Sequence, residues 1–272
     1  MNLPSSKELH FKKTTSHRGR LISVAPSNSC MEHLHYGRIL LGADTPNVAF
    51  ETQSRETGFI CLAGECTVRV GSQDVALGLH DGMYIPRGSK VEVSTTSSVD
   101  IIEFSAEVTG AYPLQIVRYA DIAKDPTLRL ETGVPGARRI LNNVLGKNVT
   151  AGRILGGFTH SQPGHWTSWP PHEHGEKLEE IYAFIDMPAP AFAIQFVYTN
   201  TETPEFIGVV REGDAVLMPA GYHPNVSIPG HSVGFVWMMA ARREVEDRKF
   251  GVVNVQPEFA TIASGLDAAR PK

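Results

Sequence analysis

Short runs of β-branched, aromatic and aliphatic residues, interrupted by glycine and proline, recur along the whole chain. In the first half they cover residues 59–62, 66–70, 90–94 and 99–105, and in the second half residues 178–184, 192–199, 206–210 and 235–239. Short strands at regular spacing with turn signals between them indicate an all-β sandwich or barrel. Helical periodicity is scarce, and residues 114–125, between the two halves, are the best candidate for a helix.

The two halves share a local pattern. An apolar segment, then Pro-x-Gly, then one polar residue occurs at 82–90 and again at 215–223. Pro-x-Gly forces a turn and presents the residue beyond it, which is Lys90 in the first half and His223 in the second. This repeat predicts a duplicated barrel with a boundary within 107–150, and we divide the chain into 1–130 and 131–272.

Composition and charge narrow the class of protein. The 272 residues are 42% hydrophobic and 20% charged, which argues against a disordered chain. The net charge is −4, and the charged residues form no long run of one sign. Neither nucleic acid nor a membrane surface is therefore an expected partner. The first twenty residues lack a secretory pattern, and the longest apolar run, 233–241, is too short for a membrane span. We expect a cytoplasmic protein, with Cys61 and Cys66 as buried free thiols.

Three histidines in the second half have the spacing of metal ligands. His172 and His174 follow two prolines that favour an extended backbone, where residues i and i+2 point to the same side. Both imidazoles can therefore reach one point. The third, His223, lies just beyond the Pro-x-Gly turn.

A carboxylate follows in the predicted strand 178–184. Glu180 shares a face with Tyr182 and with aromatic residues suited to a barrel interior, so it is the expected ligand; Glu179, on the other face, is the alternative. Three histidines and a carboxylate suit one divalent metal ion, zinc first, or manganese, iron or nickel. Such a set leaves coordination positions open for water or substrate.

Two other segments carry part of the same pattern. His33 and His35 repeat the His-x-His spacing, but no glutamate-rich strand follows them, so a surface or structural role is expected. In the first half Lys90 stands where His223 stands in the second, and residues 48–57 contain no histidine. The first barrel is therefore expected to be metal-free.

These motifs resemble those of the cupins. The run Gly213-x5-Pro219-x-Gly221-x-His223-x-Asn225 is similar to the second cupin motif, and His172-x-His174 with Glu180 is similar to the first. Longer runs, at 164–174, 179–182 and 213–224, resemble the bicupin isomerases. That group comprises 5-deoxy-glucuronate isomerase of inositol catabolism and 5-keto-4-deoxyuronate isomerase of pectin breakdown.

The resemblance covers roughly residues 36–250 and implies a bicupin fold, two jelly-roll-like barrels in tandem. It also implies a metal role for His172, His174, Glu180 and His223, aldose–ketose isomerisation of a small deoxy uronic acid, and a homo-oligomer. Residues 36–42 and 138–142 lean towards the enzyme of pectin breakdown, and residues 196–199 and 221–224 towards that of inositol catabolism. We expect 5-deoxy-glucuronate, with the other sugar acid as the alternative.

Candidate catalytic residues lie near the expected ligands. Tyr182 shares the face of Glu180 and is an acid–base candidate, and Gln195 is a candidate for holding a substrate hydroxyl; packing is the alternative role for each. Lys177, Arg153 and Arg211 are candidates for binding the substrate carboxylate. An iron dioxygenase is the main rival function, because three histidines and a glutamate also serve such enzymes. A non-catalytic sugar-binding module is the second rival, because many cupins have that role.

Overall fold

A computed structural model describes residues 6–263 and 265–266, and nearly all of its regular structure is antiparallel β-strand. The described helices are single turns: α1 (Ser6–Leu9), α2 (Tyr119–Ile122) and the 3-10 turn η1 (Pro257–Phe259). The all-β class predicted from the sequence is confirmed. Among the described residues, no helix has the length and apolar character that a bilayer crossing requires.

The first half forms two sheets. The six-stranded sheet has the order β11-β8-β5-β10-β3-β2, with bounds Gln115–Val117, Gly82–Ile85, Arg55–Gly64, Val99–Glu107, His35–Leu41 and Gly19–Val24. The four-stranded sheet has the order β4-β9-β6-β7, with bounds Asn47–Glu51, Lys90–Ser94, Cys66–Val70 and Gln73–Leu77. Residues such as Phe59, Val68 and Val93 fill the core between these sheets, together with the buried thiols of Cys61 and Cys66.

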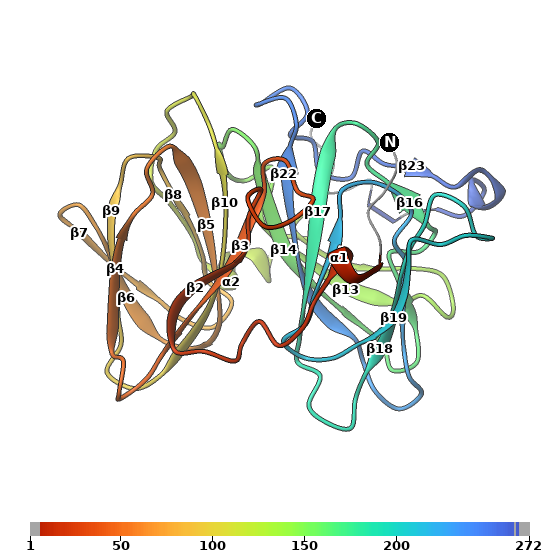
Figure 1. The fold of residues 1–272 in the computed structure, drawn as a ribbon, viewed down its shortest axis with the longest axis horizontal. Helices are drawn as coiled ribbons and strands as arrows, with labels where there is room; N and C mark the ends of the chain where they lie inside the picture. Colours follow the sequence, from red (N-terminus) through yellow and green to blue (C-terminus); the bar gives the residue numbers. More distant parts are fainter. Residues whose placement is uncertain (1–5, 264, 267–272) are drawn as a thin grey trace.

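The second half repeats this arrangement (Figure 1). The seven-stranded sheet has the order β1-β20-β17-β22-β14-β13-β12, with bounds His10–Phe11, Ala215–Met218, Leu178–Ile185, Gly234–Ala241, Ile154–Ser161, Arg139–Leu145 and Arg129–Thr132. The four-stranded sheet has the order β15-β21-β18-β19, with bounds Trp166–Thr167, Asn225–Ser227, Ala193–Val197 and Phe206–Val210. The short strands β16 (His172–Glu173) and β23 (Asn254–Val255) pair with each other.

The repeat in the sequence is also a repeat in strand order. The series β8-β5-β10-β3-β2 matches β20-β17-β22-β14-β13, and each Pro-x-Gly turn follows the equivalent strand, β8 or β20. Gly88 and Gly221 both have positive φ angles, 71° and 92°, which glycine adopts without strain. The N-terminal segment breaks the symmetry, because β1 crosses to the second half and pairs with β20, His10 opposite Val216. Figure 1 shows α1, which leads into β1, beside the second half.

Every run predicted to be a strand overlaps an observed one: β5, β6, β9 and β10 in the first half, and β17, β18, β19 and β22 in the second. The helix predicted over 114–125 is present only in part. Residues 115–117 form β11, which pairs with the edge of β8, Gln115 opposite Tyr84, and only the turn α2 is helical. The alternation of exposed Ile116 and buried Val117 follows the period of a strand.

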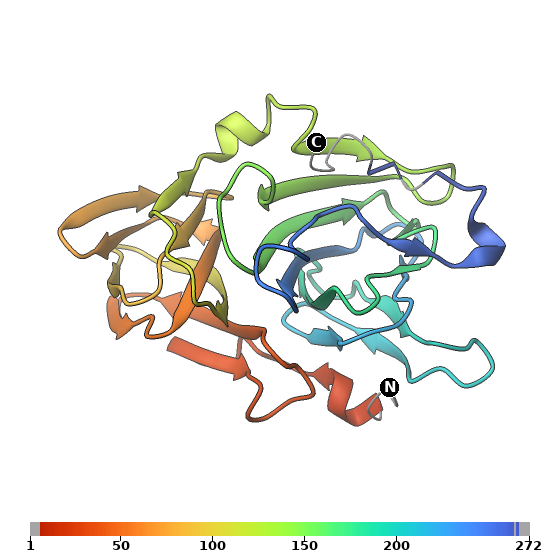
Figure 2. The ribbon, with the colours of Figure 1, turned by 90° about the horizontal axis from the view of Figure 1, so that it is seen from above.

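The two halves pack closely against each other (Figure 2). Phe104 of β10 lies between Gly58 and Gly156, where a Cβ at either glycine would come within 2.6 or 2.3 Å of its ring. The two central strands of the seven-stranded sheet, β17 and β22, are buried along their whole length. One face of this sheet meets the first half, which leaves the opposite face to line a site.

Candidate metal centre

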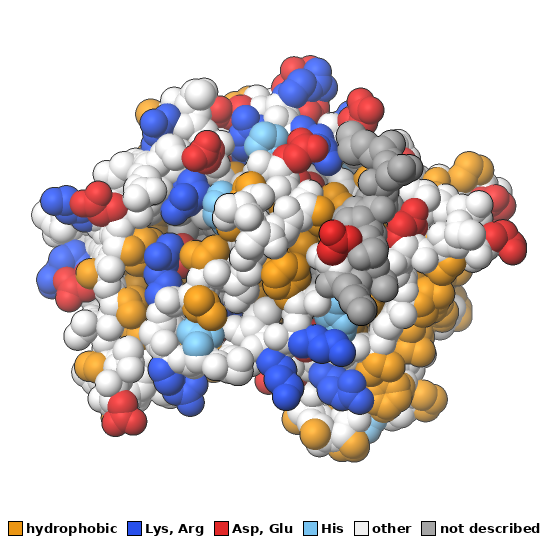
Figure 3. Space-filling model, in the orientation of Figure 1, with side chains coloured by type: hydrophobic (Ala, Val, Ile, Leu, Met, Phe, Trp, Pro, Cys, Tyr) orange, Lys and Arg blue, Asp and Glu red, His pale blue; other side chains and the backbone are white. Residues whose placement is uncertain are grey.

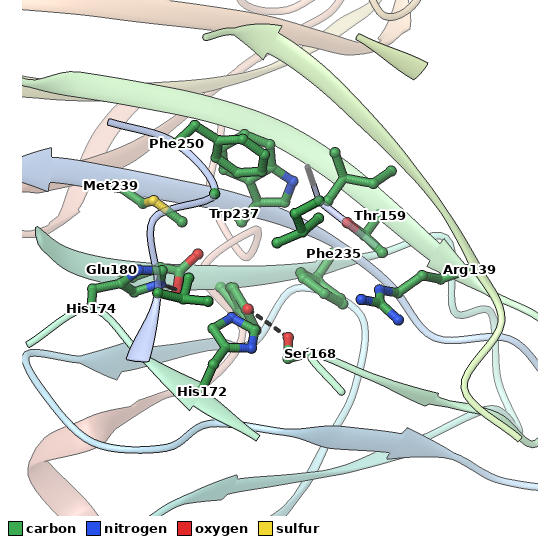
Figure 4. A pocket seen from close by; sticks show the side chains of 15 residues that line it. Arg139, Thr159, Ser168, His172, His174, Glu180, Phe235, Trp237, Met239 and Phe250 are labelled. Atoms are coloured by element: carbon green, nitrogen blue, oxygen red, sulfur yellow. Dashed lines mark hydrogen bonds and ion pairs between the residues drawn. The ribbon is translucent and has the colours of Figure 1, made fainter. Parts of the chain in front are cut away.

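Four neighbouring strands of the seven-stranded sheet build one wall of a cavity (Figure 4). Alternate residues of a strand share a face, and the strand register places these alternating residues side by side: Leu141 of β13 opposite Thr159, Thr159 opposite Phe235, and Tyr182 opposite Trp237. The residues of this wall are Arg139, Leu141, Thr159, Glu180, Tyr182, Phe235, Trp237 and Met239.

Three histidines meet beside this cavity, and two of them, His172 and His174, line it. His172 and His174 come from β16 and the residue that follows it, and His223 comes from the turn after β20. One ring nitrogen from each lies within 4.8 Å of the other two, and the side chains are at most 8% exposed. The structure therefore brings together the three histidines that the sequence singles out.

Backbone carbonyls orient two of these rings. The Nδ1 atom of His172 lies 3.0 Å from the Pro170 carbonyl oxygen, and the Nδ1 atom of His223 lies 2.9 Å from the Gly221 carbonyl oxygen. A carbonyl accepts only, so each Nδ1 carries the proton and each Nε2 keeps its lone pair. Metal-binding histidines are commonly fixed in this way, with the second nitrogen aimed at the ion.

The Glu180 carboxylate completes the group. Its Oε2 atom lies 3.0 Å from Nε2 of His174 and 3.0 Å from Nε2 of His223. The contact to His223 lacks hydrogen-bond geometry, so that nitrogen is buried without a hydrogen-bond partner among the described residues. A buried imidazole nitrogen facing a carboxylate and two further imidazoles fits a divalent metal ion.

His172 and Glu180 both have the protonation state that metal binding requires at neutral pH. Burial, together with the neighbouring rings of His223 and His174, holds the pKa of His172 well below its usual value, so the ring is neutral. Burial alone would raise the pKa of Glu180, but His174 and His223 outweigh it and lower that pKa to about 2. The nitrogen lone pair and the carboxylate charge are both available to an ion.

The alternative carboxylate points the other way. Glu179 is fully buried and accepts hydrogen bonds from the backbone N–H groups of Glu32, His33 and Leu34, at 2.8, 2.7 and 2.5 Å. The His33-x-His35 segment thus meets Glu179 through its backbone, on the face of the sheet opposite the cavity. The structure places Glu180, not Glu179, beside the three histidines.

Tyr182 lines the cavity next to this cluster. Its hydroxyl lies 2.7 Å from the hydroxyl of Ser168, and its ring stacks on Phe235 with centroids 4.2 Å apart. Burial and the nearby Glu180 charge raise its pKa well above the usual value. The phenol therefore keeps its proton at neutral pH and can donate it in a hydrogen bond.

Of the two roles considered for Gln195, the contacts of its side chain fit packing. It is fully buried, and its Nε2 donates to the carbonyl oxygens of Phe196 and His223, at 2.7 and 2.9 Å. It does not line the cavity, so its amide holds the backbone that carries His223.

The cations considered from the sequence also lie elsewhere. Neither Lys177, Arg153 nor Arg211 lines the cavity, and Arg153 donates to the backbone carbonyls of Glu107 and Ala241. The cation that does line it is Arg139, which sequence reasoning missed. The one signal in the sequence was its position two residues before Leu141, in a run that Asn142 and Asn143 interrupt.

The cavity is covered by the segment that follows β22. His172 pairs with Val255 across β16 and β23, and the Gln256 N–H donates to the Pro171 carbonyl at 2.9 Å. Phe250 stacks on Trp237 with centroids 4.7 Å apart. Gly251, Val253 and Leu266 complete this cover. Sequence reasoning did not assign this segment to the site.

The fold belongs to a cupin-like class. A cupin 2 conserved barrel domain protein from Leptotrichia buccalis superposes with a TM-score of 0.50 at 10% identity, over 83% of this chain and 89% of that chain. An IolB-like protein from Salmonella typhimurium LT2 superposes with a TM-score of 0.82 at 22% identity, over 93% and 98%.

The sequence then defines the family. The chain belongs to the KduI/IolB family, whose model matches residues 9–258, and this confirms the resemblance seen in the motifs. A 5-deoxy-glucuronate isomerase from Geobacillus kaustophilus is 26% identical over 239 residues, 82% of this chain and 84% of that protein. A 4-deoxy-L-threo-5-hexosulose-uronate ketol-isomerase from Lachnospira eligens is 27% identical over 203 residues, 72% and 71%.

Proposed function

We propose that this chain is a metal-dependent aldose–ketose isomerase that acts on a deoxy uronic acid, with 5-deoxy-glucuronate as the substrate. Both kinds of curated relative are isomerases of such acids, so the chain is an intramolecular oxidoreductase. The observation that carries the metal dependence is the buried group of His172, His174, His223 and Glu180 at one end of a cavity.

These four residues are the proposed ligands of one divalent ion, zinc first, with manganese, iron or nickel as the other candidates. When bound there, such an ion supplies a Lewis acid that polarises a carbonyl and stabilises negative charge on its oxygen. The carbonyls of Pro170 and Gly221 hold the rings in the tautomer this requires.

Tyr182 is the proposed proton donor at the reacting end of the sugar. Its raised pKa keeps the phenol protonated, so its O–H can donate to the substrate oxygen on which charge develops. The Ser168 hydroxyl, 2.7 Å away, orients the phenol and can return a proton to it. Gln195 supports the same reaction indirectly, because it fixes the backbone of His223.

The chain is also proposed to be a bicupin, with tandem barrels at 1–130 and 131–272. The repeated strand order of the two halves supports this division. Residues of β1 belong to the first unit by sequence, yet add a strand to the second. The pairing of β1 with β20 therefore links the two halves next to the strand that leads to His223.

Self-association is proposed on the outer face of the sheet β15-β21-β18-β19. Every outward side chain on β18 and β19 is apolar, and Ile207 and Val209 are 54% and 42% exposed. Figure 3 shows hydrophobic surface gathered over these strands. Exposed apolar patches of this kind mark interfaces, and a second copy of the chain is the proposed partner.

The second candidate substrate is the sugar acid named for the Lachnospira relative, which is 27% identical over 203 residues, against 26% over 239 residues for the Geobacillus relative. Both acids should be incubated separately with metal-loaded protein without oxygen, and carbonyl migration followed by NMR. We expect aldose–ketose conversion of 5-deoxy-glucuronate. Conversion of the other acid alone would make that acid the substrate. Turnover that begins only after oxygen is admitted would identify an oxidative enzyme in place of an isomerase.

A further inference from the structure

The cavity beside the histidine cluster has a second polar end. Arg139, on β13, is 5% exposed and lines the same cavity as His172 and Glu180. Its Nη1 donates to the Ala137 carbonyl oxygen at 3.0 Å, which fixes the direction of the side chain. In Figure 4 the guanidinium points from β13 into the pocket, while His174 and Glu180 lie at the other side.

A second donor lines the same cavity. The indole Nε1 of Trp237 is buried and has no hydrogen-bond partner among the described residues. Figure 4 shows this nitrogen on the side of the ring towards Thr159. The stack with Phe250 holds the indole in place. An unmatched buried N–H lowers stability unless a ligand or water accepts its hydrogen bond.

The surroundings favour an anion at this end. Burial, partly offset by the nearby Tyr182, lowers the pKa of Arg139 to about 10, so the charged guanidinium is poorly solvated. Leu141 and Phe235 beside it are apolar. A carboxylate that enters this space is matched by the planar N–H fork of arginine, which lysine cannot reproduce.

We infer that Arg139 and the indole N–H of Trp237 form the carboxylate subsite of this cavity. By binding the carboxylate, they determine which end of a sugar acid reaches the histidine cluster. The inference rests on the proposed function for the identity of the ligand. Among the described residues that line the cavity, Arg139 is the only lysine or arginine. With the carboxylate at Arg139, the carbonyl end of an open-chain acid extends towards Glu180 and Tyr182.

The test compares Arg139→Gln with Arg139→Lys on 5-deoxy-glucuronate and on its uncharged amide. Arg139→Gln is expected to raise KM for the acid roughly 10- to 100-fold and to change kcat less, because the subsite binds ground state and transition state alike. It should also remove the preference for acid over amide. Arg139→Lys should restore part of that preference, which a merely structural role would not do.

Trp237→Phe keeps the ring and removes the N–H, so it should raise KM for the acid less than Arg139→Gln does. Metal content should stay at one ion per chain in all three variants. An unchanged KM and an unchanged acid preference in Arg139→Gln would overturn the subsite. If Arg139→Gln does not fold, the preference for acid over amide is measured in Arg139→Lys and Trp237→Phe instead. The same preference as wild type in both variants overturns the inference.

Failure of the proposed function would look different. If the wild-type protein converts neither uronic acid, the proposed function is wrong. Calorimetric titration of the metal-loaded protein with gluconate then tests whether Arg139 binds a carboxylate. Weaker gluconate binding to Arg139→Gln than to wild type supports the subsite. Equal binding to both proteins, or no binding to the wild type, overturns it.

Discussion

Glu179 and Glu180 are consecutive residues of β17 whose carboxylates serve opposite faces of one sheet. Glu180 lies 3.0 Å from the Nε2 atoms of His174 and His223, and Glu179 accepts three backbone hydrogen bonds from residues 32–34. Successive side chains of a strand point to opposite faces of the sheet, so these two neighbouring glutamates, although equally buried, contact different groups. One is suited to hold an ion, and the other anchors the first half of the chain to the second.

This pair gives a matched test. Glu180→Gln is expected to lower metal affinity by more than the roughly 10- to 100-fold typical of residues behind the ligands, and to leave the fold intact. Glu179→Gln should keep the metal but lower the free energy of unfolding by roughly 1–3 kcal/mol, because three backbone N–H groups lose a charged acceptor. Elemental analysis and urea unfolding of both variants measure this. Equal metal loss in the two would refute the division of roles.

Tyr182→Phe removes the hydroxyl that faces the reacting end of the sugar. We expect kcat to fall roughly 10²- to 10⁴-fold, the usual contribution of a positioned proton donor, with metal content unchanged. Ser168→Ala is the matched control; it removes only the group that orients the phenol and should cost less. Full activity in Tyr182→Phe would leave that residue with a packing role against Phe235.

The metal-free protein should lose stability in mild acid. His172 is neutral in the folded chain because its pKa is lowered, whereas the unfolded chain takes up a proton there below about pH 6.5. The unfolded state thus binds more protons, and the free energy of unfolding falls as the pH drops below that value. His172→Asn should remove up to about 1.4 kcal/mol per pH unit from this slope.

Urea unfolding at several pH values between 7.5 and 5 measures the slopes. His33, His35 and His80 also have pKa values lowered by burial, and they contribute with the same sign in both proteins. The difference between wild type and variant therefore reports residue 172 together with its electrostatic effect on the rings of His174 and His223. Identical slopes would show that the pKa of His172 is the same in the folded and unfolded chains, which would contradict the lowered pKa.

Val209→Lys places a charge on the outer face of β19. If this face joins two copies of the chain, the variant should sediment as a smaller species than wild type at the same concentration. Leu79→Lys is the control, because Leu79 is similarly exposed, at 57%, and lies outside that sheet. The same sedimentation for wild type and Val209→Lys would remove the interface from this surface.

The histidines of the cluster could be predicted because their signals are local. His172 and His174 need only an extended backbone to converge, and a Pro-x-Gly turn presents His223. The choice of Glu180 over Glu179 followed from the aromatic residues that share its face. Each of these inferences uses the period of a strand, which tertiary packing does not change.

Arg139 could not be found in the same way. Its strand, β13, also buries Asn142 and Asn143, so polar residues stand at positions where a strand pattern calls for apolar ones. The segment that covers the site was not predicted for another reason, because β23 is two residues long and carries no strand pattern. Gln195 was correctly assigned to a strand, but only the packing of β18 behind His223 shows that its amide faces the backbone.

The most direct test of the metal-centred account is reconstitution. Protein stripped by a chelator should be inactive on 5-deoxy-glucuronate, and added Zn²⁺ should restore turnover that saturates at one ion per chain. His174→Ala, folded as judged by circular dichroism, should bind no tight metal and show no turnover. Full turnover by the stripped protein, or by His174→Ala, would contradict the account.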